Sequence, residues 1–262
     1  MNSIPILVDL KGRHALVTGG GTGIGSALCI GLARCGATVV INYSRSKNDA
    51  EQTVKVIKTG GGQAIAVKAD ITDEDQVKQL VDISLNEFGG LHILVANAGG
   101  PTEYKPTIEL EEGDWNQGMG INCKSVFYCV KHTVPHLPNK TGRVIINSSG
   151  SARSGAGPGM ITYAASKGAI AQLTRQMAIE YAGNNIRVVA VCPGTVDTPL
   201  VHESAKTSGN YDQYMQKLYD GHPVGRIASA DEIAKLYLYL SSDDASFITG
   251  ANIMIDGGFT AQ

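Results

Sequence analysis

Two stretches of the chain place a tyrosine four residues before a lysine: Tyr163 and Lys167 in YAASK, and Tyr43 and Lys47 in YSRSK. On a helix this spacing brings both side chains onto one face. A free phenol has a pKa of about 10, so it exchanges protons poorly at neutral pH unless a nearby cation stabilises the phenolate. A tyrosine–lysine pair could therefore act as a general acid and base. Because the pattern is short, the surrounding residues must decide which copy carries chemistry.

The surroundings of Tyr163 favour that copy. The segment RVIINSSG, residues 143–150, has the apolar run of a strand and ends in serines, and the helix with Tyr163 follows it. In α/β sheets, ligands bind at the carboxyl ends of the strands. Taken alone, the helix could also present Tyr163 and Lys167 to solvent. The remaining motifs of the chain favour chemistry over that alternative.

A glycine-rich turn near the start of the chain predicts a nucleotide site. In HALVTGGGTGIGSAL an apolar run leads to Gly19, Gly23 and Gly25, and an amphipathic segment follows. The spacing differs from G-x-G-x-x-G, but the physical demands are the same: a tight turn, close backbone approach and a helix N-terminus facing a phosphate. No G-K-[ST] follows, which argues against a Walker A loop.

The elements that must position these residues alternate along almost the whole chain. Apolar runs predict strands at 14–19, 37–43, 63–70, 91–99, 143–150, 186–194 and 251–258, and helices are expected near 24–35, 48–59, 73–87, 114–136, 160–182 and 231–241. Continuous apolar strands separated by helices are typical of a parallel sheet covered on both faces. We therefore expect one Rossmann-like, doubly wound α/β domain over residues 1–262, with a seven-stranded parallel sheet.

Composition excludes several partners. The 262 residues are 43% hydrophobic and 18% charged with a net charge of −2, which gives no reason to expect nucleic acid or an anionic membrane as a partner. No apolar stretch reaches the length of a membrane span, and residues 1–20 lack a basic region and a cleavage site, so a cytoplasmic protein is expected. The five cysteines, at 29, 35, 123, 129 and 192, contain no C-x-x-C and are expected to be buried thiols.

The glycine turn, preceded by Thr18, resembles the cofactor motif of the short-chain dehydrogenase/reductase family. Similar motifs follow in the family's order: Asp70 after the third strand, Asn97-Ala98-Gly99 after the fourth with Ala96 in place of the family's first Asn, and Pro193-Gly194 with Thr198 after the sixth. Within the family, the chain resembles three groups equally: 3-oxoacyl carrier-protein reductases, glucose dehydrogenases and naphthol reductases. The resemblance implies an enzyme that interconverts a ketone and a secondary alcohol by hydride transfer to or from NAD(P).

The resemblance also implies a catalytic set of Asn122, Ser149, Tyr163 and Lys167. Tyr163 would exchange the substrate proton. Lys167 would lower the pKa of Tyr163 and hold the nicotinamide ribose. Ser149 would donate a hydrogen bond to the oxyanion, and Asn122 would anchor a water. Ser148 and Ser151 compete with Ser149 for the serine role. Ser149 lies fourteen positions before Tyr163, where the family usually has thirteen, so we infer a one-residue insertion in the loop SARSGAGPG.

Cofactor contacts are implied along the whole chain. They fall on the glycine turn (Gly19, Gly21, Thr22, Gly23, Ile24, Gly25), the end of the second strand (Tyr43, Ser44, Arg45), Asp70 and Ile71, Asn97, Ala98 and Gly99, Tyr163 and Lys167, and Pro193, Gly194, Val196 and Thr198. An NAD-preferring relative usually has an acid where this chain has Tyr43. The nearby Arg45 could instead hold a 2′-phosphate, which predicts NADP(H), with NAD possible.

The segment 195–222 is longer than a usual connection and is expected to form a lid over the substrate. Its apolar and aromatic residues favour a neutral ketone or secondary alcohol.

His132 and His136 are spaced like metal ligands, but Pro135 interrupts the turn and no third ligand is evident, so no metal is expected. Small residues in helices 114–136 and 160–182 permit close helix approach. Because such helices pair between subunits in the family, the resemblance implies a homotetramer, with a dimer as second choice. An NAD-dependent alcohol, polyol or sugar dehydrogenase, a non-catalytic nucleotide-sensing regulator and a nucleotide-sugar epimerase are the alternatives considered.

Overall fold

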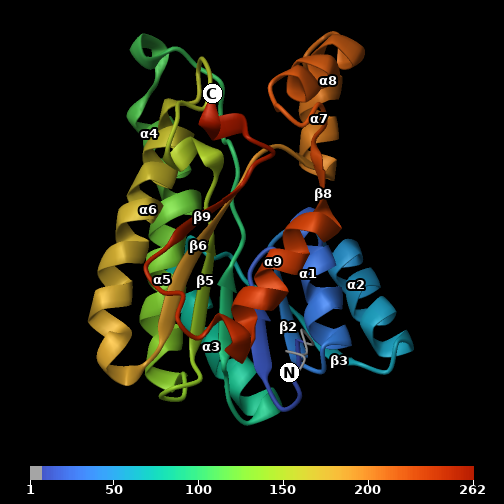
Figure 1. Cartoon of the computed structure of the whole chain (residues 1–262), viewed down its shortest axis with the longest axis vertical. Coiled ribbons are helices and arrows are strands. Elements are labelled where there is room, and N and C mark those ends of the chain that lie inside the picture. The colour runs from blue at the N-terminus through green and yellow to red at the C-terminus, as the bar shows by residue number, and fades with distance from the viewer. Residues whose placement is uncertain (1–7) are drawn as a thin grey trace, which may run out of the picture.

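A computed structural model describes residues 8–262; the expectation of no leader segment falls partly on residues 1–7, outside that range. Seven parallel strands form the main sheet in the order β3-β2-β1-β4-β5-β6-β9 (Figure 1). Their bounds are β1 (His14–Val17), β2 (Thr38–Tyr43), β3 (Gln63–Lys68), β4 (Ile93–Ala96), β5 (Arg143–Asn147), β6 (Arg187–Pro193) and β9 (Asn252–Ile255). The predicted seven-stranded parallel sheet is confirmed.

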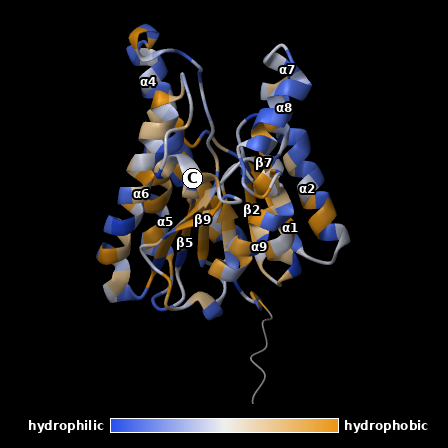
Figure 2. Cartoon of the chain, turned by 45° about the horizontal axis from the view of Figure 1, so that its top comes forward, coloured by the Kyte–Doolittle hydropathy of each residue, from blue (hydrophilic) through white to orange (hydrophobic). Residues whose placement is uncertain are grey.

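Helices cover both faces of this sheet, as predicted. One face carries α1 (Gly23–Arg34), α2 (Lys47–Thr59) and α9 (Ala230–Ser241), and the other carries α3 (Glu74–Phe88), α5 (Ser125–Thr133) and α6 (Ile161–Tyr181). Each layer closes its own apolar core, for example around Leu28 and Ile233 on one face and Val77 and Ile170 on the other. Figure 2 shows hydrophobic residues concentrated along the central strands. Strands buried on both faces explain the continuous apolar runs.

The strand order reverses next to β1, which pairs with β2 on one side and with β4 on the other. At such a reversal the loops after the two strands run in opposite directions and leave a crevice at the carboxyl edge of the sheet. The glycine turn follows β1, and Asn97-Ala98-Gly99 follows β4. Both sequence motifs therefore border the same crevice.

The helix expected at 114–136 is interrupted, which corrects that prediction. The chain forms α4 (Glu112–Met119), a π-helical turn (Gly120–Lys124), α5 and a 3₁₀ turn (Val134–His136). The Asn122 side chain donates to the carbonyl of Gly118, 3.0 Å away, and the backbone N–H of Ser125 reaches back five residues to Gly120. A side chain inserted into the hydrogen-bond ladder widens the turn.

The segment 195–222 contains two helices and a short strand. β7 (Val196–Asp197) pairs with β8 (Ala228–Ser229), and α7 (Pro199–Thr207) and α8 (Tyr211–Asp220) rise above the sheet (Figure 1). Met215 and Ala205 form a small apolar cluster between them with Ile227. These helices stand next to the carboxyl edge of the sheet, which is the position that a lid requires.

The cysteine prediction is only partly right. Cys29, Cys129 and Cys192 are buried free thiols, but Cys35 and Cys123 are partly exposed. Cys35 follows the last residue of α1, and Cys123 lies in the π-helical turn, so neither side chain is fully covered. Within residues 8–262 no helix combines the length and apolar character needed to cross a lipid bilayer.

Candidate active site

Hydrogen bonds fasten the glycine turn to the loop after β4. The Thr18 hydroxyl accepts from the backbone N–H groups of Asn97 and Ala98, at 3.0 and 3.1 Å. In return, the Asn97 side chain donates to the carbonyls of Thr18 and Gly19, at 3.0 and 3.2 Å. Thr18 and Asn97 are both buried. These reciprocal bonds hold the two edges of the crevice in one arrangement.

The glycine turn leaves room for a phosphate at the start of α1. The helix has no acidic residue in its first turn, and the side chain of its N-cap, Thr22, makes no capping bond. The first N–H groups of a helix carry partial positive charge and favour an anion. A Cβ at Gly25 would lie 2.2 Å from the Gly19 carbonyl oxygen, so only glycine lets the turn fold this tightly over the helix. The turn therefore fits a dinucleotide pyrophosphate.

Asn42 supports the glycine turn and was missed in the sequence. It is buried in β2, its carbonyl accepts from Gly20 N at 3.0 Å, and its side chain donates to the Ala69 carbonyl at 3.0 Å. The signal was available, because an amide inside the apolar strand TVVINY must find hydrogen-bond partners.

Lys167 is almost completely buried, with 2% of its surface exposed. Its ammonium donates to the backbone carbonyl of Asn147, 2.8 Å away, and lies 5.5 Å from the centre of the Tyr163 ring. Burial lowers the pKa of Lys167 to about 8. The spacing that singled out YAASK thus brings a phenol and an ammonium together beside the end of β5.

The pKa of Tyr163 responds to the Ser149 side chain and not to that of the more deeply buried Ser148. Burial raises the pKa of Tyr163, and hydrogen bonding with the Ser149 side chain acts against this rise. In the protein without cofactor, burial therefore affects the pKa of Tyr163 more than the lowering that was expected from Lys167. Ser148 is only 3% exposed, and the Ser149 hydroxyl accepts from Ser151 N at 3.1 Å. Ser149 as the catalytic partner of Tyr163 stays a prediction, which its effect on the tyrosine pKa favours.

Asn147 and Tyr237 extend this cluster and were also missed. The Tyr237 hydroxyl, fully buried in α9, donates to the Asn147 side-chain oxygen at 2.8 Å. The Asn147 amide donates in turn to the Asn97 carbonyl at 3.2 Å. One chain of bonds thus joins Lys167, Asn147 and Asn97. The Asn in RVIINSS was a signal, whereas nothing in the pattern of α9 distinguished Tyr237 from an ordinary core residue.

Asn122 holds the loop after β4. Its side chain donates to the Gly100 carbonyl at 2.9 Å and accepts from Gly100 N at 2.8 Å. A Cβ at Gly99 would lie 2.6 Å from the Asn122 amide oxygen, so a larger residue would displace this bond. The π-helical turn therefore holds the buried Asn122 side chain under the loop that borders the crevice, with its amide bonded to the backbone.

The remaining predicted cofactor residues surround the glycine turn. A Cβ at Gly21 would meet the Ser46 hydroxyl at 3.2 Å, and one at Gly23 would meet the Thr198 methyl at 3.0 Å. The turn thus lies between the loop containing Arg45 and the segment after β6. The Asp70 carboxylate, exposed after β3, accepts from the N–H and hydroxyl of Thr72 at 2.9 and 2.7 Å. The predicted residues converge on one edge of the sheet from six strands.

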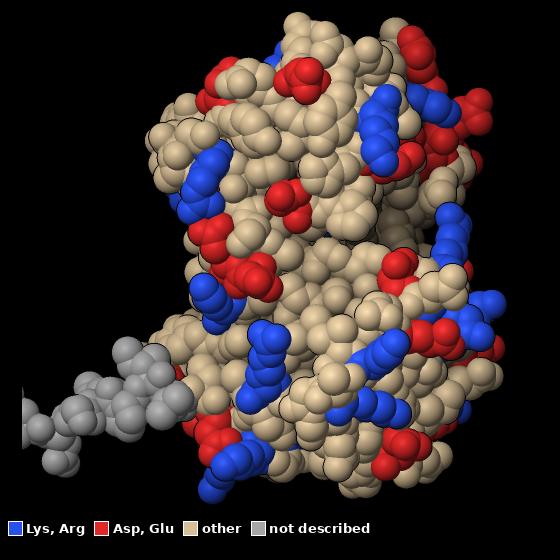
Figure 3. Space-filling model, turned by 90° about the vertical axis from the view of Figure 1, so that its right-hand side faces the viewer, with Lys and Arg blue, Asp and Glu red and all other residues tan. Residues whose placement is uncertain are grey.

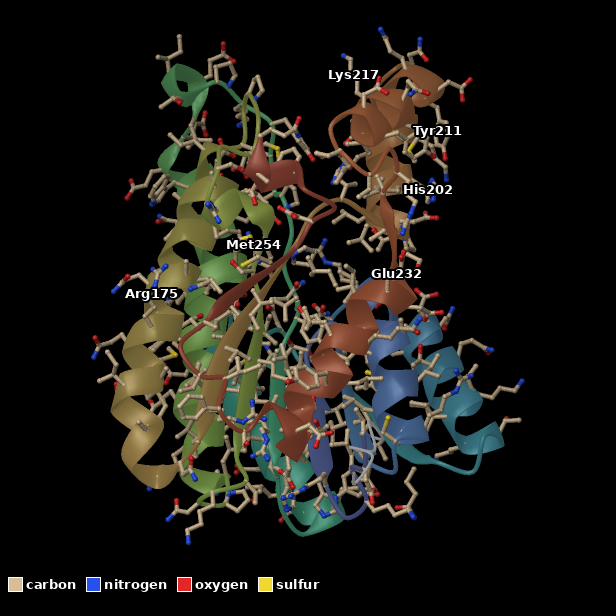
Figure 4. The ribbon with its side chains drawn as sticks, viewed as in Figure 1. Arg175, His202, Tyr211, Lys217, Glu232 and Met254 are labelled. Carbon is tan, nitrogen blue, oxygen red and sulfur yellow. The ribbon has the colours of Figure 1, made fainter. Side chains whose placement is uncertain are left out.

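A chain of three polar side chains braces the lid. His202 of α7 lies 2.6 Å from the Asp197 carboxylate of β7 and 2.6 Å from the Tyr211 hydroxyl of α8. Figure 4 shows His202 and Tyr211 together on the raised helices. The face shown in Figure 3 carries basic and acidic side chains side by side, so that face presents no field of one sign to a polyanion.

Comparison with known proteins identifies the family. The model described as enoyl-(acyl carrier protein) reductase matches residues 19–260. A cis-4-hydroxycyclohexanecarboxylate dehydrogenase from Sinomonas cyclohexanicum is 37% identical over 249 residues, 95% of this chain and 97% of that protein. The chain belongs to the short-chain dehydrogenase/reductase family.

Other members agree with this assignment. A short-chain dehydrogenase/reductase structure from Serratia marcescens superposes with a TM-score of 0.89 at 36% identity, covering 96% of this chain and 99% of that one. A cyclohexanol dehydrogenase from an Acinetobacter species is 34% identical over 95% of this chain and 96% of its own. As a short-chain dehydrogenase/reductase, the protein is an oxidoreductase that uses a nicotinamide cofactor.

Proposed function

We propose that this protein is an NADP(H)-dependent oxidoreductase that interconverts a neutral ketone and a secondary alcohol, with Tyr163 as the general acid and base. The observation that carries the proposal is the cluster of partly buried Tyr163 and Ser149 with buried Lys167, beside a glycine turn that fits a phosphate. The pairing of a proton donor with a nucleotide site is what a reversible carbonyl reduction needs.

The residues divide the chemistry between them. When bound, the nicotinamide cofactor would supply a hydride to the carbonyl carbon or take one up from the alcohol in the reverse direction. Tyr163 donates its hydroxyl proton to the oxygen that gains negative charge, and Ser149 donates a hydrogen bond to the same oxygen. Lys167 places positive charge near the phenol and favours the phenolate that remains. Asn122 keeps the loop after β4 in position.

The substrate class follows from the lid and the relatives. Leu200, Tyr211 and Tyr214 give α7 and α8 an apolar and aromatic surface, and two relatives are named for cyclohexanol and hydroxycyclohexanecarboxylate substrates. A six-membered ring with one hydroxyl or carbonyl is the first substrate to test. A panel of cyclic and linear ketones with NADPH, and of the alcohols with NADP, identifies the preferred one.

Tyr163→Phe tests the chemistry because it keeps the ring and removes the proton. Turnover should fall by about a hundredfold or more, while NADPH should bind as in the wild type. Turnover is measured by absorbance of the reduced nicotinamide, and binding by its fluorescence. Tyr181→Phe is the matched control, because Tyr181 lies on the same helix but at its far end, eighteen residues after Tyr163. A Tyr163→Phe enzyme with more than a tenth of wild-type turnover would exclude this role.

The cofactor preference rests on Arg45. The residue is exposed just after β2, and no acidic partner lies within 4 Å of its guanidinium in the described part of the chain. It is therefore free to bind a phosphate, which a guanidinium holds with two hydrogen bonds. The next acid along the chain, Asp49, belongs to the first turn of α2.

Arg45→Ala should weaken the binding of NADPH by about tenfold to a hundredfold and leave the binding of NADH nearly unchanged. Tyr43→Asp should reverse the preference, because its carboxylate would repel the 2′-phosphate and accept from the ribose hydroxyls. Lys47→Ala, at the first residue of α2, is the matched control. A wild-type enzyme with the higher kcat/KM for NADH would favour the alternative of an NAD-dependent alcohol, polyol or sugar dehydrogenase. A protein that exchanges hydride with none of the tested ketones and alcohols would favour the alternative of a nucleotide-sensing regulator.

A further inference from the structure

His222 connects the lid to the segment that follows β6. It lies just beyond the end of α8 and is 4% exposed. Its Nδ1 is 2.7 Å from the carbonyl oxygen of Leu218 in α8, and its Nε2 is 3.0 Å from the backbone nitrogen of Thr195. The ring also packs on Phe259 near the C-terminus, with centroids 5.4 Å apart.

These two partners fix the form of the imidazole. A carbonyl oxygen can only accept, so Nδ1 must carry a hydrogen, whereas the Thr195 N–H can only donate, so Nε2 must have a free lone pair. The ring is therefore a neutral imidazole with its hydrogen on Nδ1. The His222 side chain therefore donates a hydrogen bond to the lid and accepts one from the backbone of the segment 193–198.

The segment 193–198 depends on such contacts for its position. Gly194 N donates to the Ile255 carbonyl at 3.2 Å, and the Thr195 carbonyl accepts from Ala228 N at 3.1 Å. The bond to His222 completes the anchoring of the Thr195 peptide. A Cβ at Gly194 would lie 2.7 Å from His222 Nε2 and 3.0 Å from the backbone of Asp256, so the segment and the imidazole are packed in direct contact.

The far end of this segment reaches the glycine turn. Thr198 begins α7, and its methyl would meet a Cβ at Gly23 at 3.0 Å. A shift of the Thr195 peptide therefore moves backbone that lies against the cofactor turn. A shift at Leu218 instead moves α8, which lies farther from that turn.

We propose that His222 is a positioning residue for the cofactor: through Nε2 it fixes the segment 193–198 against the nucleotide, and through Nδ1 it ties the lid helix α8 to that segment. This inference rests on the proposed function, because it takes the nucleotide to bind between the glycine turn and residues 193–198. The nicotinamide end of either NADPH or NADH would depend on it, since the two nucleotides differ only at the adenine ribose.

Two isosteric variants separate the two bonds. In His222→Asn the amide nitrogen can replace Nδ1 and donate to Leu218, but no acceptor reaches Thr195. In His222→Gln the amide oxygen can replace Nε2 and accept from Thr195, while the bond to Leu218 is lost. Each variant loses one hydrogen bond, so general destabilisation should be similar in both and is measured by thermal melting. His136→Asn, the same change at an exposed histidine, is the control.

The full-length variants are titrated with NADPH and with NADH, and their substrate KM is measured. His222→Asn should weaken both nucleotides about tenfold. His222→Gln should bind both nucleotides within about threefold of the wild type and show a raised substrate KM. If His222→Asn does not fold, His222→Leu is the reserve variant, because leucine keeps the packing on Phe259 without either hydrogen bond. It should weaken the binding of both nucleotides by a similar factor.

Equal nucleotide affinities in the wild type and in the asparagine or leucine variant would overturn the inference, and so would equal weakening in the glutamine and asparagine variants. In either case the proposed function would stand, because the wild type binds its cofactor. A wild-type protein that binds neither nucleotide would overturn the proposed function, and the role of His222 with it.

Discussion

The buried ammonium of Lys167 is costly for the folded chain. Burial lowers its pKa from 10.5 to about 8, so at neutral pH the protein keeps a charge in an environment that disfavours it. A shift of this size corresponds to roughly 3 kcal/mol at pH 7. The bond to the Asn147 carbonyl returns only part of this cost. A residue that destabilises the fold and lies beside Tyr163 is typical of a site selected for function.

Lys167→Met should therefore raise stability while it abolishes activity. It removes the buried charge and keeps the apolar stem, so the cofactor-free protein should be about 1–2 kcal/mol more stable at pH 7. The folded pKa is lowered, so between pH 8 and 10.5 the unfolded chain holds more protons and the wild type gains stability as pH rises. The advantage of the variant should shrink across that window. Urea unfolding at pH 7 and 9.5 measures it, and a variant less stable than the wild type at pH 7 would contradict it.

At the residue scale, a sequence can place a side chain beside its neighbours only where that side chain belongs to a local pattern. Tyr163 and Lys167 share a helix face, and Ser149 lies two residues beyond the end of the preceding strand, β5. Asn42 and Asn147 could have been noticed as amides in apolar strands. Tyr237 and His222 could not, because their partners are 90 and 27 residues away and depend on how helices pack over the sheet.

At the scale of elements, helix α1 must approach the glycine turn without a side chain between them. A Cβ at Gly25 would lie 2.2 Å from the Gly19 carbonyl oxygen and 2.8 Å from the Asn97 amide. Neither neighbour can move freely, because both belong to the network around Thr18. The close approach therefore leaves no room for a side chain at this position.

Gly25→Ala should therefore weaken NADPH binding by more than tenfold and destabilise the fold by about 1–3 kcal/mol. Gly31→Ala, on the same helix, is the matched control. Its Cβ would meet the end of the Leu238 side chain at 3.0 Å, and a flexible leucine can turn away. Nucleotide titration and thermal melting of the two variants measure the difference. Equal effects at both glycines would mean that the turn can adjust.

The order of elements was predictable, and their irregularities were not. Alternating apolar runs and helical segments indicated every strand of the main sheet. The π-helical turn at Gly120–Lys124 depends on a side-chain bond of Asn122 that periodicity cannot show. The pairing of β7 with β8 joins two-residue strands that are about thirty residues apart, too short to produce any pattern.

At the scale of the whole molecule, the outer face of α5 and α6 exposes apolar side chains. Phe127 is 46% exposed, Ile161 37% and Ile179 73%. Gly168 has open space where a Cβ would point, so this face of α6 can approach another helix closely. Figure 1 shows α6 along one edge of the molecule, beside α5. An apolar face with small residues on two adjacent helices favours packing against a second copy.

We therefore expect a homotetramer, with a dimer as the second choice, in which these helices pair between subunits. Light scattering at micromolar concentration should give about four times the 27.5 kDa of one chain. Ile179→Glu should lower that mass, because it places a carboxylate in the apolar contact. Ile83→Glu makes the same change at a 43% exposed position on α3, outside the α5–α6 face, and should leave the mass unchanged. A wild-type mass near 27.5 kDa would show that the exposed face of α5 and α6 remains in solvent.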